Sequence, residues 1–323
     1  MIEASAKTRA RKWSRPEAAT LSRRWINLIT WSFTALTGIA CAVVIMLVAL
    51  ILGNIAYHGL HNLSWGFLTT APTSGMTEGG IFPAIFGTAF LVLLMTIAVV
   101  PLGVGTAIYL QEYAPAGSRW VHVVRMAIQN LAGVPAIVFG LFGLGFFVEF
   151  LGRNIDRLLM GGELHFGQPA ILWASLTMAL LTLPTVVVST EEALRVVPRS
   201  HREVAYALGA TRWQMVRYVL LPQAVGGILT GTILAVGRGA GEVAPILFTG
   251  AAYYLPYLPT RLHHQFMELG YHVYVMTTQS PDIDATKPIL YATVFVLLAL
   301  TFLLNFAAII IRSNIRRRLA AGR

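Results

Sequence analysis

Charged residues are scarce in this chain. Only 12% of its 323 residues are Asp, Glu, Lys or Arg, whereas hydrophobic residues make up 56%. A soluble domain contains about 25% charged residues, so about half of the usual complement is missing. A soluble core of this size cannot bury so much apolar surface, but a lipid bilayer can cover it. The composition therefore excludes an ordinary soluble protein and indicates an integral membrane protein.

Cysteine and lysine are rarer still. The single cysteine, Cys41, rules out a disulfide framework within the chain. The three lysines are Lys7, Lys12 and Lys287, and none of them ends a G-x-x-x-x-G sequence. The chain therefore has no Walker phosphate loop and is not expected to be its own ATPase of that type.

Motifs of hydrolytic and metal sites are also missing. The sequence contains neither H-E-x-x-H nor G-x-S-x-G. His58 with His61, and His263 beside His264, are spaced like metal ligands, but they lack cysteine or carboxylate neighbours at ligand spacing. We therefore expect interfacial histidines, no metal site and no catalytic residue.

Long uncharged runs occupy most of the sequence. Each holds about 20 or more residues, enough for a helix to cross about 30 Å of hydrocarbon. Lipid leaves no alternative to a helix, because an open strand would leave its backbone groups unpaired. The runs predict an all-α membrane protein with about six spans, near residues 30–54, 84–110, 129–150, 169–190, 222–247 and 289–311. The first run is too long for a signal-peptide core and is expected to be retained.

Basic residues are distributed unevenly between the two sides that these spans define. If both termini are cytoplasmic, the inner segments hold 19 Lys and Arg residues, and the outer segments hold four: Arg153, Arg157, Arg261 and Lys287. Positive charge accumulates on cytoplasmic segments, so we predict that both termini are cytoplasmic. The net charge of +10 then reflects topology, and nucleic acid is not an expected partner.

One membrane domain accounts for this organisation. We expect a basic cytoplasmic tail over residues 1–28, a transmembrane domain over 29–312 and a second basic tail over 313–323. The longest outer loop, about residues 250–288, carries an aromatic and proline-rich stretch followed by two aspartates, and is expected to be solvated.

The inner loop between the fourth and fifth runs reads PRSHREVAYALGATRWQMVRYVLLP. Ser200 followed by Glu203 predicts a capping box that starts a short helix, which Gly209 ends. Thr211 with Gln214 predicts a second capping box and another helix. A helix, a glycine turn and a second helix form a compact charged protrusion suited to docking against a partner at about residues 199–220.

This loop resembles the EAA motif of binding-protein-dependent ABC importer permeases. In that motif a glycine follows the glutamate by six residues, and a Leu-Pro pair follows the glycine after a fixed gap. The matching residues are Glu203, Ala205, Gly209, Leu221 and Pro222. Val204 departs from the pattern, which has alanine there. The resemblance implies that these residues couple the chain to an ATPase.

Two further segments narrow the resemblance. NLAGVPAIVFGLFG, residues 130–143, and GRGAGEVAPILFTG, residues 237–250, are similar to phosphate-specific permeases of the PstA type. The resemblance implies a six-helix, MetI-like core in the bacterial inner membrane that imports inorganic phosphate. The implied partners are a homologous PstC-type permease, an ATPase dimer that binds ATP and magnesium, and an extracytoplasmic phosphate-binding protein, beside membrane lipid. No cofactor is expected on this chain.

Arg238 and Glu242 are the charged residues expected within the fifth span. An ionised group in mid-bilayer costs at least about 2.5–3.5 kcal/mol, so such residues usually face a cavity or each other. Four residues apart on one helix, the two can form a purely structural ion pair. In the alternative hypothesis, Arg238 binds a passing phosphate and Glu242 holds the guanidinium in place. The resemblance implies that both positions matter.

Two other functions remain open at this point. A permease of the same fold could carry another oxyanion such as phosphonate, sulfate or molybdate. A membrane-embedded enzyme with Arg238 and Glu242 as its active site is the other alternative, although the spans offer it no nucleophile or metal cluster.

Overall fold

The computed structural model describes residues 18–73, 78–115, 117–280 and 282–321. The first part of the predicted N-terminal tail, residues 1–17, and Arg323 lie outside the described residues. Two compact units, residues 1–54 and 55–323, make up the chain. Within the described part, six helical segments are long and apolar enough to cross a membrane, which confirms the predicted fold class: Trp25–His61, Phe82–Tyr113, Ala136–Leu159, Ile171–Val196, Arg212–Gly239 and Ile283–Arg318.

The first unit contributes most of one long helix, α1 (Ala18–His61). Throughout residues 25–54 its side chains are exposed, including large apolar ones such as Trp31 and Ile39. The hydroxyls of Thr30 and Thr34 donate to the backbone carbonyl four residues earlier. Polar groups satisfied within the helix and an apolar outer surface are the properties that a lipid-facing span requires.

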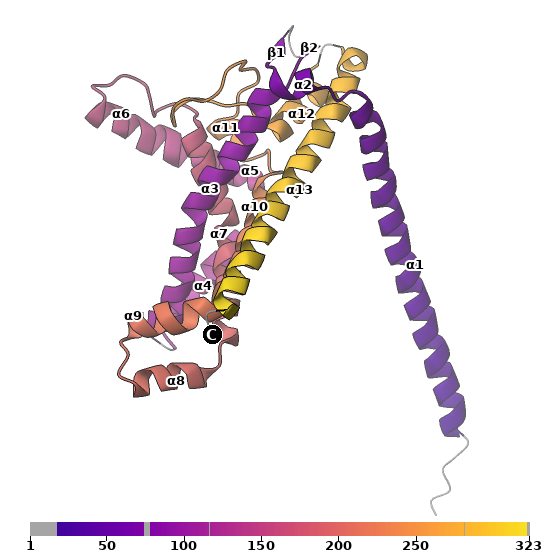
Figure 1. Ribbon diagram of the computed structural model, residues 1–323, viewed down its shortest axis with the longest axis vertical. Helices are drawn as coiled ribbons and strands as arrows, with labels where there is room; N and C mark the ends of the chain where they lie inside the picture. The colour runs from indigo at the N-terminus through magenta and orange to yellow at the C-terminus, as the bar shows by residue number, and fades with distance from the viewer. Residues whose placement is uncertain (1–17, 74–77, 116, 281, 322–323) are drawn as a thin grey trace, which may run out of the picture. The chain divides into compact units, whose positions relative to one another are not determined.

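The second unit is a helical bundle with a short hairpin at one end (Figure 1). The hairpin pairs β1 (Pro72–Thr73) with β2 (Glu78–Gly79) in antiparallel register. The first half of the bundle contains α2 (Trp65–Thr69), α3 (Phe82–Ile108), η2 (Tyr109–Tyr113), α4 (Arg119–Leu131), α5 (Ala136–Phe142), η3 (Gly143–Gly152) and α6 (Arg153–Leu159). The second half contains α7 (Ile171–Val196), α8 (Arg199–Ala207), α9 (Arg212–Met215), η4 (Val216–Leu220), α10 (Leu221–Gly239), α11 (Ile246–Thr249), α12 (Leu269–Thr278) and α13 (Ile283–Ala321). The η elements are π-helical.

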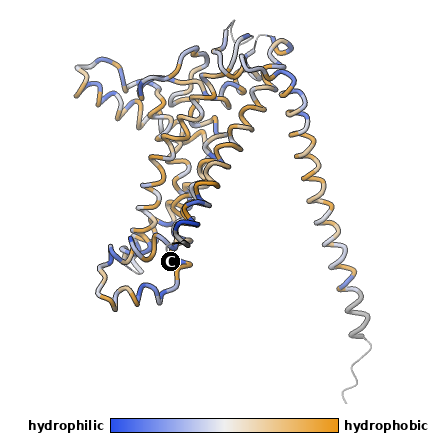
Figure 2. Tube along the Cα trace, viewed as in Figure 1, coloured by the Kyte–Doolittle hydropathy of each residue, from blue (hydrophilic) through white to orange (hydrophobic). Residues whose placement is uncertain are grey.

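Helix α7 forms the centre of this unit. In its most apolar stretch, 67% of the residues are buried, compared with 33% in the corresponding stretches of the segments that contain α3 and α10. Met178 of α7 lies in one apolar cluster with Met95 of α3 and Ala235 of α10. Hydrophobic residues dominate the middle of the helices, and hydrophilic residues gather at the C-terminal end of α13 (Figure 2). In this unit the end of α13 lies at the same end of the bundle as α8 and α9 (Figure 1).

The third span lies further along the chain than the sequence predicted. It runs over Ala136–Leu159, and residues 119–131 form the separate amphipathic helix α4. A turn follows α4, and Pro135 precedes the first residue of α5. Because a proline disfavours helical geometry at the residue before it, Val134 interrupts the helix. The uncharged run therefore contained a break that its hydropathy did not reveal.

The segment of residues 250–288 is not the solvated loop that we predicted. Phe266, Met267 and Leu269 are almost completely buried, and α12 occupies ten of its residues. The buried apolar side chains on either side of Glu268 pack this segment into the protein, although two aspartates lie near the end of the segment. Likewise, α13 continues to Ala321, so the described part of the predicted C-terminal tail is helical.

Glu268 is a buried carboxylate that caps α12. It accepts hydrogen bonds from the backbone nitrogens of Gly270 at 2.9 Å and Tyr271 at 2.6 Å, and from the Thr88 hydroxyl at 3.4 Å. Burial raises the pKa of Glu268 to about 7, although these hydrogen bonds lower it. A raised folded-state pKa favours the folded protein below the ordinary value near 4.5, and that contribution is lost as the pH rises through about 7.

We therefore expect the melting temperature of the purified protein to fall between about pH 5 and about pH 8. Glu268→Gln removes the ionisable group and should flatten this decline. Glu192→Gln is the matched control, because Glu192 is exposed and forms no ion pair within the described part of the chain, so its replacement should leave the slope unchanged. The same slope in Glu268→Gln as in the unmodified protein would show that the carboxylate is not the source.

Candidate functional site

The loop between α7 and α10 folds as two short helices, α8 and α9, joined by a glycine turn, as predicted. One detail was wrong: Pro198, and not Ser200, occupies the N-cap of α8, and no side chain caps this helix. The capping box of α9 is confirmed. The Thr211 nitrogen donates to Gln214 Oε1 at 2.8 Å, and the Gln214 nitrogen donates to the Thr211 hydroxyl at 3.3 Å.

Gly209 makes the turn between these helices. Its φ is +78°, a left-handed conformation that glycine adopts without strain. The Gly209 nitrogen donates to the Tyr206 carbonyl, and the Ala210 nitrogen donates to the Ala205 carbonyl, which closes the end of α8. A Cβ added at Gly209 would meet no atom within 4 Å. Backbone conformation, and not lack of space, therefore favours glycine here.

Helix α8 presents one face inward and one to the surroundings. Ala205 is buried in an apolar cluster with Met215 and Leu220, where a small side chain lets α8 approach α9 and η4. Glu203 and Leu208 are exposed, and Glu203 forms no ion pair within the described part of the chain. The outer face of α8 thus combines an available carboxylate with apolar surface.

Two ion pairs that we did not predict lie in this part of the structure: one attaches α8 to the bundle, and the other joins α4 to α7. Arg202 of α8 lies 2.8 Å from Glu112 of η2 and also donates to the Leu194 carbonyl of α7 at 2.9 Å. Arg125 of α4 lies 3.1 Å from Glu191 of α7. The Glu112 and Glu191 side chains are only 7% and 11% exposed, so removing either arginine would leave a largely buried carboxylate without its partner.

Leu221 and Pro222 lie within a continuous helical segment and do not start a new one. Segment Arg212–Gly239 runs from α9 through η4 into α10. Pro222 lacks an N–H, and its ring would clash with the carbonyl four residues earlier in a regular α-helix. The π-helical turn η4 comes directly before it and accommodates the ring. The Leu-Pro pair therefore marks the junction between α9 with its π-helical turn and the long helix α10.

The fifth span is interrupted where we predicted continuity. Helix α10 ends at Gly239, and α11 begins only at Ile246. Glycines at 239 and 241 favour a break, and Pro245 has no N–H to continue the helix. Arg238 occupies the last turn of α10, and Glu242 lies beyond it, so the two do not share one regular helix face.

Arg238 and Glu242 nevertheless contact each other. The distance from Arg238 Nε to Glu242 Oε1 is 3.2 Å. Their side chains are 40% and 26% exposed, so the pair is accessible and not sealed in the core. The terminal amino groups of Arg238 have no hydrogen-bond partner among the residues that the structure describes. The guanidinium therefore retains free donors.

The interruption is held firmly on both sides. Ala240 and Ile246 are buried in the same apolar cluster as Phe139 of α5. A Cβ added at Gly140 would lie 3.0 Å from the Pro245 carbonyl oxygen, so the absence of a side chain allows α5 to approach the break. The two segments around residues 130–143 and 237–250, which are distant in sequence, thus form one structure.

Comparisons with known proteins agree with this geometry. Residues 99–321 match the family described as binding-protein-dependent transport system inner membrane component. The probable ABC transporter permease protein YqgI of Bacillus subtilis is 32% identical over 266 residues, which cover 78% of this chain and 85% of that protein. The chain belongs to this permease family. It is a multi-pass protein of the bacterial inner membrane and a component of an ABC importer.

Other relatives of the permease match over shorter stretches. The phosphate transport system permease protein PstA of Yersinia pestis is 37% identical over 194 residues, 59% of this chain and 60% of that protein. A bacterial ABC transporter involved in the import of the acidic polysaccharide alginate shares the fold, with a TM-score of 0.59 at 17% identity. That match covers 88% of this chain and 98% of the other, which confirms the MetI-like core.

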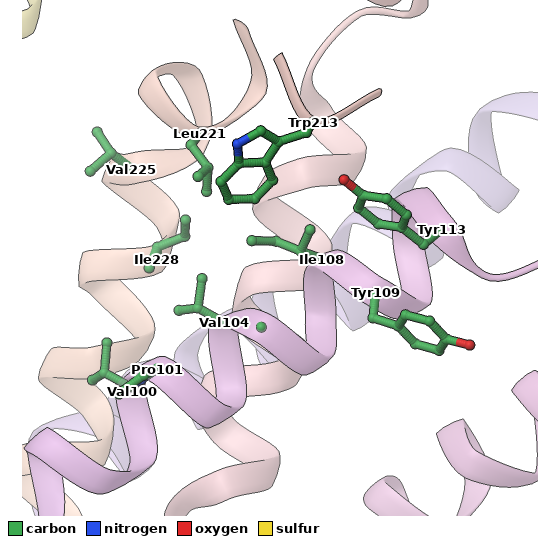
Figure 3. A pocket seen from close by; sticks show the side chains of 11 residues that line it. Val100, Pro101, Val104, Ile108, Tyr109, Tyr113, Trp213, Leu221, Val225 and Ile228 are labelled. Atoms are coloured by element: carbon green, nitrogen blue, oxygen red, sulfur yellow. The ribbon is translucent and has the colours of Figure 1, made fainter. Parts of the chain in front are cut away.

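A separate apolar groove of about 830 Å³ lies between α3 and α10 of the permease. Trp213 and Leu221 lie on one side of it, and Val104 and Ile108 lie on the other (Figure 3). No charged side chain lines this groove. A hydrated anion would lose its water there without compensation, so the groove is a poor candidate for an anion path. The break beside Arg238 is the better one.

Proposed function

We propose that this permease imports inorganic phosphate and that Arg238 binds the anion during its passage. The observation that carries the proposal is the exposed guanidinium of Arg238 at an interrupted membrane helix. Transporters commonly bind substrate where a spanning helix is discontinuous. Similarity to proteins named as phosphate permeases, at 37% and 39% identity, supports phosphate as the substrate.

The contact with Glu242 leaves both terminal amino groups of Arg238 free to donate hydrogen bonds to an anion. Only Nε is engaged by the carboxylate. The two terminal amino groups can therefore donate in parallel to two phosphate oxygens, a geometry that lysine does not offer. Glu242 orients the guanidinium and, by its negative charge, limits how tightly the anion is held. This arrangement favours a substrate site over a purely structural ion pair.

We further propose that α8 and α9 dock against an ATPase dimer. Glu203 lies exposed for pairing with a basic residue of that partner, Ala205 and Gly209 set the shape of the helix pair, and Leu221 with Pro222 forms the joint to α10. Because Arg212–Gly239 is one helical segment, a displacement of α9 reaches Arg238 at its other end. ATP and magnesium would bind to the ATPase, with no catalysis on this chain.

The remaining partners follow from the same proposal. A homologous permease of the PstC type would complete the path, and an extracytoplasmic phosphate-binding protein would deliver the anion. Both termini and the α8–α9 pair would face the cytoplasm, as the distribution of basic residues supports.

Uptake measurements test the proposed substrate. The permease and its partner subunits are expressed in cells that lack other phosphate importers, and uptake of radiolabelled phosphate is followed at micromolar concentration. We expect saturable uptake that excess unlabelled phosphate abolishes and that sulfate, molybdate and a phosphonate leave unchanged. Uptake of labelled sulfate or molybdate in place of phosphate would contradict the proposal and assign another oxyanion.

A further inference from the structure

A basic pocket lies at the inner end of α13, away from the proposed phosphate path. It encloses about 490 Å³ and is lined by Ile309, Arg312, Ser313, Arg316 and Arg317. Three guanidinium groups and one hydroxyl thus surround a single hollow. This combination of donors suits an anion with several oxygen atoms.

Helix α10 orients two of these arginines. Arg312 donates from Nη1 to the Thr230 hydroxyl at 2.9 Å. Arg316 packs over Gly226, where an added Cβ would lie 3.6 Å from both Cδ and Nε of Arg316. At this distance a Cβ would be in ordinary van der Waals contact, so Gly226 and Arg316 lie close together without crowding. All five lining residues belong to α13, and α10 contacts two of its arginines, Arg312 and Arg316.

The positive charge in this pocket is not balanced by the chain itself. None of the three arginines forms an ion pair in the part of the chain that the structure describes. Arg312 and Arg316 are four residues apart on one helix, where like charges repel and destabilise the helix. A bound anion would remove that repulsion.

The pocket also follows directly after the apolar stretch of α13. Ile309, Ile310 and Ile311 are exposed apolar residues on α13, and the arginines follow within about two helical turns. Basic pockets between helices at the cytoplasmic surface are typical sites for anionic headgroups. The exposed isoleucines would contact the acyl chains of the same lipid.

We propose that Arg312, Arg316 and Arg317 form a binding site for a phosphate group, supplied by the headgroup of an anionic phospholipid or by free inorganic phosphate. The adjoining isoleucines favour the lipid. This site is distinct from Arg238 and does not depend on which anion the permease transports.

Native mass spectrometry of the full-length protein in neutral detergent tests this site. Phosphatidylglycerol, phosphatidylcholine and inorganic phosphate are titrated separately. We expect the unmodified protein to retain phosphatidylglycerol in preference to phosphatidylcholine, and a variant combining Arg312→Gln, Arg316→Gln and Arg317→Gln to bind it at least tenfold more weakly. Binding of inorganic phosphate that the same variant loses would also support the site, with free phosphate as the ligand.

The matched control removes three other exposed arginines of the inner surface through Arg195→Gln, Arg199→Gln and Arg217→Gln. It should retain phosphatidylglycerol as the unmodified protein does. Equal loss in both triple variants would show unspecific attraction to positive charge and overturn the proposal. Unchanged binding in the pocket variant would overturn it too. Melting curves verify that both variants remain folded.

Discussion

Replacing Arg238 with glutamine should reduce phosphate uptake to background while the importer still assembles and hydrolyses ATP. Glutamine keeps a polar side chain but removes the charge and the fork of donors that the free amino groups of Arg238 provide. Arg238→Lys restores the charge without the fork, so we expect it to recover only a small part of the uptake. Radiolabelled phosphate uptake and ATPase activity, measured on the same preparations, separate transport from hydrolysis.

The chain offers a matched control for this experiment. Arg153 lies 2.9 Å from Glu149 in a pair of the same spacing, so Arg153→Gln breaks a comparable ion pair away from the helix break. It should leave uptake unchanged. Exchanging the two charges, Arg238→Glu with Glu242→Arg, keeps an ion pair but moves the guanidinium. Near-normal uptake in the exchanged protein would show that the pair is only structural.

Gly209→Val should separate ATP hydrolysis from transport. Valine is strained at a φ of +78°, where an L-residue pays about 1–2 kcal/mol and a branched side chain pays more. The turn would shift to relieve that strain and change the angle between α8 and α9. We expect at least a tenfold loss of uptake and of the ATPase stimulation by the loaded binding protein, with normal membrane insertion.

Gly209→Asn is the control for this change. Asparagine tolerates the left-handed conformation, and a Cβ at this position meets no neighbouring atom. It should therefore retain most of the coupling. If Gly209→Val behaves like the unmodified protein, the turn is not needed for docking. If asparagine is as harmful as valine, the bulk of the side chain and not the backbone is responsible.

The sequence predicted most of what depends on local patterns. Uncharged runs located the spans, and the α9 capping box and the turn at Gly209 followed from residue types with strong positional preferences. Features that depend on distant contacts were missed. Arg202 and Glu112 are 90 residues apart, and no local pattern in one sequence pairs them.

The other wrong predictions came from judging a segment by its average polarity. Residues 222–247 are apolar almost throughout, so their hydropathy did not indicate the break after Gly239. The glycines and Pro245 were the local signals that could have predicted it. Asp282 and Asp284 made the segment of residues 250–288 resemble a solvated loop, whereas ten of its residues form α12, whose first turn Glu268 caps. In each case the backbone's hydrogen-bond partners decided the structure more than the average polarity did.

Reconstitution in proteoliposomes is the most direct test of the central claim that this chain is the permease of an ATP-driven phosphate importer. The permease is assembled with its partner permease, ATPase dimer and binding protein, and labelled phosphate in the lumen is measured alongside ATP hydrolysed. The account predicts phosphate accumulation against its gradient that requires both ATP and Arg238. ATP hydrolysis that drives accumulation of another anion, with no phosphate gained, would contradict it.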